Sequence, residues 1–77
     1  MSNFFEKVQE EVDKAKKVYP NDFNNFHEGY AVLLEEVDEL WDEIKKKNPD
    51  LCNLKKEVIQ VSAMCKRIYD ELLVKGK

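Results

Sequence analysis

Apolar residues recur every three or four positions over three long stretches of this 77-residue chain, which end in turn at Pro20, Pro49 and Gly76. Spacing of this kind is typical of amphipathic helices, because a strand would alternate apolar and polar residues at every second position. Only two glycines and two prolines are present, so few positions are available for turns. We therefore expect an all-α fold, a small antiparallel bundle of three helices that forms one domain over residues 1–77.

Capping residues indicate where the first two helices begin. The first helix is expected from about Asn3 to Val18, with Asn3 and Glu6 as a capping pair. The second is expected to begin near Asn24 or Asn25, because an asparagine oxygen can accept a hydrogen bond from the first turn.

The third helix is expected to start with Asn48 as its N-cap and Pro49 as its first helical residue. All three helices should turn one apolar stripe toward the core. The predicted inward residues are Phe5, Val8, Val12, Ala15 and Tyr19 on the first helix; Phe26, Tyr30, Leu33, Val37, Leu40 and Ile44 on the second; and Leu51, Leu54, Val58, Val61, Cys65, Ile68 and Leu72 on the third.

The apolar arc of the second and third helices is wider than one stripe, because Leu34, Trp41 and Tyr69 flank it. A chain this short buries a small fraction of its surface, and a three-helix monomer needs roughly one 100° stripe per helix. We therefore expect a homodimer or homotetramer to cover the surplus and complete the bundle.

Net charge and cysteine content argue against several classes of protein. A net charge of −3 disfavours a general binder of DNA or RNA polymers, since no basic face dominates. Cys52 and Cys65 occur without a CxxC motif, which predicts reduced thiols rather than a zinc site or a disulfide. The sequence has no signal-peptide pattern and no apolar run of membrane-spanning length. A cytoplasmic protein without membrane contact is expected.

Between Glu35 and Glu43, six of nine residues are acidic and none is basic. Side chains three or four positions apart are neighbours on a helix, so these carboxylates repel one another. Glu36 and Glu39 lie within roughly 60° of each other around the helix axis. An acidic helix face is often only solvated, but a divalent cation bound by oxygen ligands would offset the repulsion.

Glu57 is the matching carboxylate on the third helix, where it has no basic partner three or four residues away. If the second and third helices pack antiparallel, Glu36, Glu39 and Glu57 can meet across the groove between them. Two carboxylates about 4 Å apart repel by roughly 4 kcal/mol near a protein surface, which favours metal binding or proton uptake. Hard oxygen donors without a soft ligand predict Mg²⁺, with Mn²⁺ as the alternative.

Residues 27–41 and 56–64 resemble the MazG-like branch of the all-α nucleoside triphosphate pyrophosphohydrolases. Those enzymes carry an ExxE-type pair on one helix and an ExxD pair on the next. The acidic residues that match are Glu35, Glu36, Glu39 and Glu57. Gln60 stands where the last acidic ligand of the family is expected.

The resemblance implies a Mg²⁺-dependent enzyme that hydrolyses a nucleoside triphosphate between its α and β phosphates, releasing a nucleoside monophosphate and pyrophosphate. Cleansing of the nucleotide pool is one role that this activity would serve. The implied metal ligands are Glu35, Glu36, Glu39, Glu57 and Gln60, and the implied catalytic residues are Glu36 and Glu39. Candidates for contacts with the substrate are Lys45 and Lys46, which could reach phosphates, and Trp41, which could stack on a base.

The alternative is a catalytically silent helical interaction or oligomerisation module that retains the same scaffold. The neutral Gln60 supports this alternative, because an amide oxygen can coordinate a cation but contributes no charge. The base and sugar of the nucleotide, and the number of subunits, are left open by the sequence.

Overall fold

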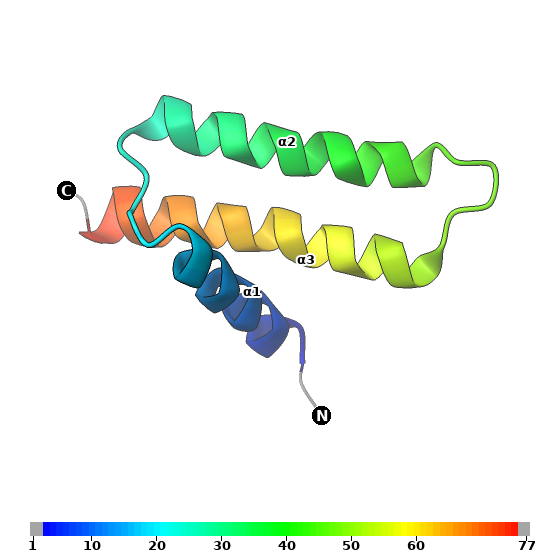
Figure 1. The fold of residues 1–77 in the computed structure, drawn as a ribbon, viewed down its shortest axis with the longest axis horizontal. Helices are drawn as coiled ribbons and strands as arrows, with labels where there is room; N and C mark the ends of the chain where they lie inside the picture. Colours follow the sequence, from blue (N-terminus) through cyan, green and yellow to red (C-terminus); the bar gives the residue numbers. More distant parts are fainter. Residues whose placement is uncertain (1–2, 76–77) are drawn as a thin grey trace.

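The computed structural model describes residues 3–75 and has the all-α architecture expected from the sequence (Figure 1). Three α-helices, α1 (Phe4–Val18), α2 (Phe26–Ile44) and α3 (Leu51–Arg67), are followed by a π-helix, η1 (Ile68–Lys75), which continues α3. Residues 3–75 contain no strand. The predicted end of the third helix at Gly76 lies outside the described residues.

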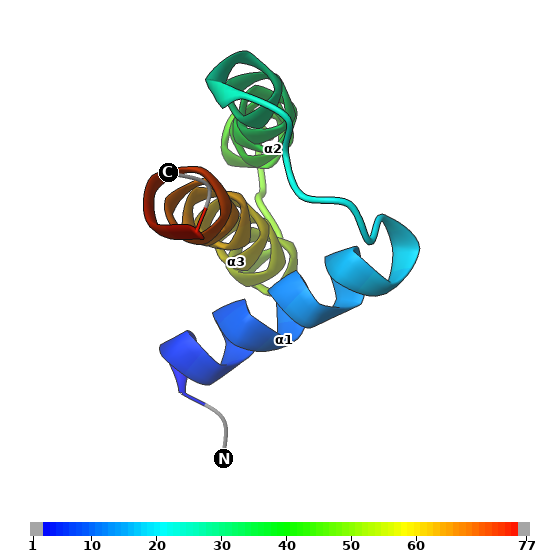
Figure 2. The same ribbon diagram turned by 90° about the vertical axis from the view of Figure 1, so that its left-hand side faces the viewer.

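The central element of the fold is α3. The antiparallel helix α2 packs along one side of α3, and α1 crosses the opposite side (Figures 1 and 2). Within the described part of the chain, α1 and α2 make no backbone contact with each other. The molecule is therefore a thin layer, with principal extents of 43 × 31 × 20 Å.

Helix boundaries follow the capping chemistry. The predicted capping pair of α1 is confirmed, because Asn3 Oδ1 accepts from the Glu6 N–H at 2.9 Å and Glu6 Oε1 accepts from the Asn3 N–H at 3.0 Å. Asn25 caps α2 through the Glu28 N–H, at 2.8 Å. The predicted start of α3 at Asn48 was wrong. Asp50 is the N-cap, since its carboxylate accepts from the N–H groups of the second and third helical residues.

The apolar core is small and lies where all the elements meet α3. Its buried members are Val8, Val12, Phe23, Ala63, Met64 and Leu72. Val8 and Val12 confirm the centre of the stripe predicted for α1, with Ala15 packed partly against it. The ends of that stripe were wrong. Phe5 is 77% exposed and Tyr19 is 70% exposed, because α1 crosses α3 at an angle and only its middle lies on the core.

The inward face predicted for α2 was only partly right. Leu33 and Leu40 are half-buried, but the other predicted residues are exposed, namely Phe26, Tyr30, Val37 and Ile44. Gly29 and Glu43 are buried in their place. Gly29 lets α2 approach η1 closely, and Glu43 Oε1 and Oε2 accept from Lys46 Nζ at 2.8 Å and the Asp50 N–H at 2.9 Å. Helix α2 is thus rotated about its axis, so that its most apolar face does not point toward α3.

The stripe predicted for α3 needs a similar correction. Leu72 is buried, whereas the predicted inward residues Leu51, Val58 and Cys65 are exposed. Ala63, Met64 and Arg67 are the buried residues of α3, because α1 and α2 contact it from opposite sides.

Since α1 and α2 flank α3 on opposite sides, the linker of residues 19–25 must cross over α3 (Figure 2). It is fixed at the crossing by Phe23, whose buried ring lies 4.1 Å from the Arg67 guanidinium carbon and whose N–H donates to Glu71 Oε1 at 2.8 Å. Arg67 Nε donates to Glu71 Oε2 at 2.8 Å. Ion pairs of Asp22 with Lys16 and Lys75 hold the outside of the linker. Over residues 3–75, no helix combines the length and the apolar character needed to cross a bilayer.

Candidate metal centre

Glu36 and Glu39 on α2 and Glu57 on α3 converge on one point between the two helices. One carboxylate oxygen from each lies within 4.8 Å of one from each of the others. The first two are one turn apart on the same helix face, and the antiparallel packing of α3 brings Glu57 opposite them. Glu36 and Glu57 are half-buried and Glu39 is exposed. The cluster therefore has an open side through which an ion and a ligand could approach.

The electrostatics of the cluster disfavour three negative charges. Partial burial raises the pKa of Glu36 to about 7, and the neighbouring charges of Glu39 and Glu57 contribute in the same direction. The pKa of Glu57 is also raised, by burial and then by Glu39, with partial compensation from Lys56. Without a cation, Glu36 is thus partly protonated at neutral pH.

Gln60 bridges the two helices. With its amide nitrogen turned toward the carboxylates, it donates to Glu36 Oε1 at 3.1 Å and to Glu57 Oε1 at 3.0 Å. These hydrogen bonds partly compensate the negative charge. Rotating the amide would instead turn its oxygen toward the centre of the cluster, where it could act as a neutral ligand.

Two further acidic residues border the cluster. Glu35, a predicted metal ligand, is exposed and lies outside the group of three carboxylates. Glu11 on α1 was not predicted, yet it is half-buried and its charge contributes to the raised pKa of Glu36. The sequence signal for Glu11 was its place beside Val12, at the border of the inward stripe, but only the crossing of α1 over α3 brings it near α2.

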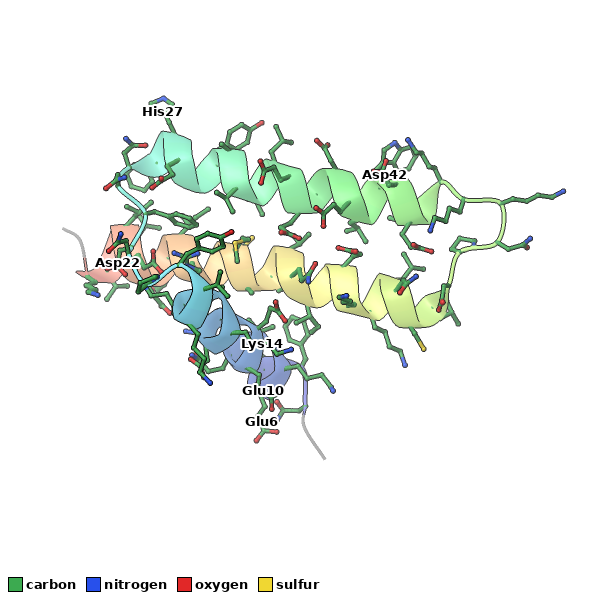
Figure 3. All side chains as sticks on the ribbon, in the orientation of Figure 1. Glu6, Glu10, Lys14, Asp22, His27 and Asp42 are labelled. Carbon is green, nitrogen blue, oxygen red and sulfur yellow. The ribbon has the colours of Figure 1, made fainter. Side chains whose placement is uncertain are left out.

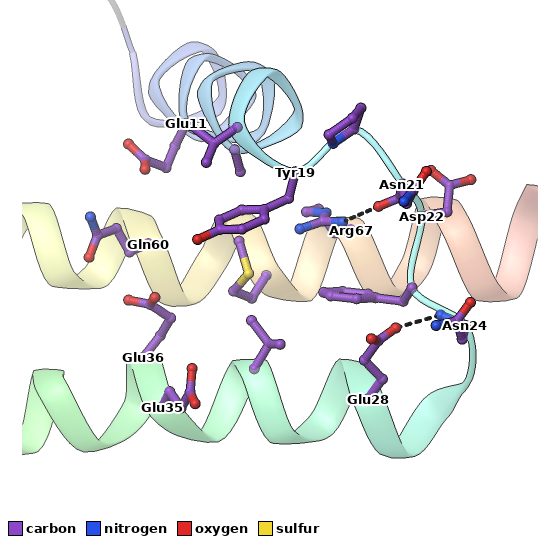
Figure 4. Close-up of a pocket in the computed structure, with 16 residues that line it drawn as sticks. Glu11, Tyr19, Asn21, Asp22, Asn24, Glu28, Glu35, Glu36, Gln60 and Arg67 are labelled. Carbon is purple, nitrogen blue, oxygen red and sulfur yellow. Dashed lines mark hydrogen bonds between the residues drawn. The ribbon is translucent and has the colours of Figure 1, made fainter.

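A chamber of about 650 Å³ opens beside the cluster, under the linker that joins α1 to α2. Glu36 and Gln60 border one end, and Arg67 and Asn24 border the other (Figure 4). The Tyr19 ring extends over the space between them. The site therefore combines a group of carboxylates with an adjoining cavity large enough for a small molecule.

The residues predicted to contact the substrate do not line this chamber. Lys45 pairs with Asp42 at 3.1 Å, and Lys46 pairs with Glu43 at 2.8 Å. Trp41 is exposed on α2. Asp42 and the exposed His27 both lie on the outer surface of α2 (Figure 3). Contacts of Lys45, Lys46 and Trp41 with a substrate stay predictions.

Comparisons of the chain with protein-family models, with curated proteins and with solved structures find no match.

Proposed function

We propose that this protein is a Mg²⁺-dependent nucleoside triphosphate pyrophosphohydrolase that releases a nucleoside monophosphate and pyrophosphate. One observation carries the proposal: carboxylate oxygens of Glu36, Glu39 and Glu57, from two helices, lie within 4.8 Å of one another. Three hard oxygen donors suit Mg²⁺ or Mn²⁺. The resemblance to MazG-like enzymes involves these same residues and supplies the reaction.

A bound Mg²⁺ would neutralise phosphate oxygens and help to orient the anhydride for attack by water. Glu36, Glu39 and Glu57 would hold the ion, with Gln60 as a fourth, neutral donor. Glu36 would act as proton acceptor through a carboxylate oxygen that does not bind the ion. Its pKa of about 7 belongs to the metal-free cluster, and a bound cation would lower it. In that role Glu36 would take a proton from the attacking water. Attack at the α phosphorus would release the bridging oxygen with pyrophosphate, and attack at the β phosphorus would release it with the monophosphate.

The direct test is pyrophosphate release from a panel of canonical and modified nucleoside triphosphates, with Mg²⁺ and with Mn²⁺. Glu36→Gln and Glu39→Gln should each abolish turnover. The matched control is Asp38→Asn, because Asp38 is an exposed acidic residue of the same helix outside the cluster. Loss of activity in the control as well, or no release from any substrate, would contradict the proposal.

Metal binding has its own test that does not depend on turnover. Mg²⁺ at a hundred times its dissociation constant should stabilise the fold by about 2.7 kcal/mol. The thermal midpoint should therefore rise with Mg²⁺ in the wild type and stay unchanged in Glu36→Gln. An unchanged wild-type midpoint would favour the silent interaction module instead.

The proposal includes a homodimer, which an uncovered apolar face supports. The exposed apolar residues of α2 are Phe26, Tyr30, Leu34, Val37, Trp41 and Ile44. They occupy about 80° of the helix circumference, and the part of α2 that contacts α3 separates this apolar face from Glu39. Because α2 and α3 are antiparallel, the exposed Val58 and Cys65 of α3 fall on the same side.

Two such faces packed together would complete a four-helix arrangement of α2 and α3 from each subunit. Helix α1 covers neither face of the pair, since it lies on the far side of α3 from α2. The carboxylates would remain open on the outer surface of this dimer. The same face would serve the silent module, so the metal and pyrophosphate measurements decide between the two functions.

A further inference from the structure

The chamber beside the carboxylates has acidic residues at both ends, Glu35 and Glu36 near Gln60 and Glu28 and Asp22 near Asn24 (Figure 4). Its lining also includes the apolar residues Val32 and Met64. Side-chain amides of Asn21 and Asn24 border the far end (Figure 4). The volume of about 650 Å³ lies within the range of roughly 300–1,000 Å³ that small-molecule sites occupy.

Tyr19 lines this chamber. It is 70% exposed, and its ring extends over the cavity toward Gln60 (Figure 4). Among residues 3–75 the Tyr19 ring has no aromatic or cationic ring partner. The linker that carries it is nevertheless fixed, because Phe23 is buried against Arg67 and its N–H donates to Glu71. An exposed aromatic ring thus borders a chamber that Val32 and Met64 also line.

We propose that this chamber holds the heterocyclic base of the nucleotide, stacked on Tyr19, with the phosphates directed toward Glu36. This inference rests on the proposed function and adds the residue that would bind the base. A base presents flat faces to Tyr19 and Met64 and polar edges to the amides of Asn21 and Asn24, which offer both donors and acceptors. A nucleotide combines charged phosphates with a flat base, which would suit a chamber with the carboxylate cluster at one end and an exposed tyrosine beside it.

The base site can be tested without metal or turnover. Free nucleosides, which lack phosphate, are titrated into protein labelled with ¹³C at the methionine methyl groups. The Met64 methyl signal should shift in the wild type and in Tyr19→Phe, and should need about tenfold more nucleoside to shift in Tyr19→Ala. Tyr69→Ala is the control and should behave as the wild type, because Tyr69 is also an exposed tyrosine but does not line the chamber.

A second measurement separates the base from the phosphates. With Mg²⁺ present, calorimetry compares an α,β-methylene nucleoside triphosphate, which cannot be cleaved at that bond, with inorganic triphosphate. Tyr19→Ala should weaken binding of the nucleotide analogue about tenfold, as expected for the loss of one stacking contact, and should leave inorganic triphosphate unchanged.

The outcomes distinguish the two proposals. If nucleosides shift the Met64 signal through Tyr19 while no metal-dependent nucleotide binding is seen, the base site stands and the hydrolase is wrong. If inorganic triphosphate binds with Mg²⁺ but the nucleoside adds no affinity, the base site is wrong and the metal site stands. An equal loss for both ligands in Tyr19→Ala would also overturn the base site, because Tyr19 would then act on the metal end.

Discussion

Glu36 combines two unfavourable features, partial burial and two neighbours of the same charge, and its pKa of about 7 reflects both. Protonation and cation binding are two ways to remove the same charge, so they compete. Glu39 and Glu57 share the cluster, but Glu36 is the residue that links it to the chamber. The pH dependence of the protein should therefore report mainly on this residue.

Stability of the metal-free protein should fall as the pH rises from about 4.5 to about 7. The folded state holds a proton on Glu36 more tightly than the unfolded chain, so this contribution is complete below pH 4.5 and is lost through pH 7. Glu36→Gln should weaken this trend, leaving the part due to the raised pKa of Glu57, and be more stable than the wild type at pH 8. The expected gain is about 1 kcal/mol after allowance for solvent screening.

Urea unfolding at a series of pH values measures this difference. At pH 4 the two proteins should be nearly equal, because Glu36 is then neutral in both states. The pKa values of Asp22, Glu43 and Glu71 are lowered, so their contributions are lost only below about pH 4.5. A Glu36→Gln variant with the pH profile of the wild type would contradict the assignment.

Arg67 and Glu71 are a buried ion pair, 5% and 8% exposed. Glu71 also accepts the Phe23 N–H, so it satisfies two buried donors. Burial raises the pKa of Glu71, but the hydrogen bonds from Arg67 and Phe23 together lower it by more. The pKa of Glu71 is therefore below its usual value. Glu71→Ala should destabilise the fold by about 3 kcal/mol, because it leaves the Arg67 charge buried without a partner.

The neighbouring pair provides the control for this prediction in chemical denaturation. Lys66 and Asp70 form an ion pair with the same spacing one residue earlier, but both side chains are more exposed. Asp70→Ala should therefore cost less than about 1 kcal/mol. Equal losses from the two substitutions would show that burial does not set the strength of the Arg67–Glu71 pair.

At the scale of elements, the close approach of α2 to η1 depends on Gly29. A Cβ atom there would lie 3.0 Å from Ile68 Cγ1 and 3.4 Å from Leu72 Cδ1. This contact sets the rotation of α2 and so determines which side chains meet α3. It places Gly29, Glu36 and Glu43 toward α3 and leaves a separate apolar face exposed.

Larger side chains at position 29 should be destabilising in proportion to their size. Gly29→Leu should cost about 1–3 kcal/mol by overpacking against Ile68 and Leu72. For Gly29→Ala, a gain of about 1 kcal/mol in helix propensity should be largely offset by the tight contact. Ala31→Leu, at an exposed position of the same helix, is the control and should change the unfolding free energy by less than about 0.5 kcal/mol. A harmless Gly29→Leu would mean that α2 does not pack on η1 at this point.

At the scale of the whole molecule, the fold is a layer with one face left apolar. Its radius of gyration is 13.1 Å, above the value of about 11.5 Å expected for a compact chain of this length. Among the described residues, α1 and α2 both contact α3 but make no backbone contact with each other, so the core has a single layer. A second subunit on the exposed face of α2 would supply the missing layer.

Sedimentation equilibrium should therefore find a dimer at micromolar concentration. Val37→Glu and Trp41→Glu should each shift the protein toward monomer, because they place a charge within the apolar face. Phe5→Ser is the control, since Phe5 is the most exposed large apolar residue but belongs to α1. A wild type that stays monomeric, or a control that dissociates as readily as the two variants, would contradict this interface.

The sequence by itself determined the three helices, the capping of α1 and α2, and the position of Glu36 and Glu39 on one helix face, from which a meeting with Glu57 was predicted for antiparallel packing. These features follow from local geometry. Residues three apart share a helix face, capping groups lie within one turn, and a short connection makes neighbouring helices antiparallel.

Only the tertiary structure decided which face of each helix is buried. The apolar arc of α2 is so wide that more than one rotation of the helix about its axis would bury apolar residues. Hydrophobic periodicity therefore could not predict which rotation occurs. The choice depends on partners distant in the sequence. Gly29 meets Ile68, and Arg67 is held by Glu71 and, through its Nη2, by the Asn21 carbonyl 46 residues away. From the sequence, charged residues such as Arg67 and Glu43 are predicted to lie on the surface. The free-energy cost of burying them is offset only by hydrogen bonds that form in the folded chain.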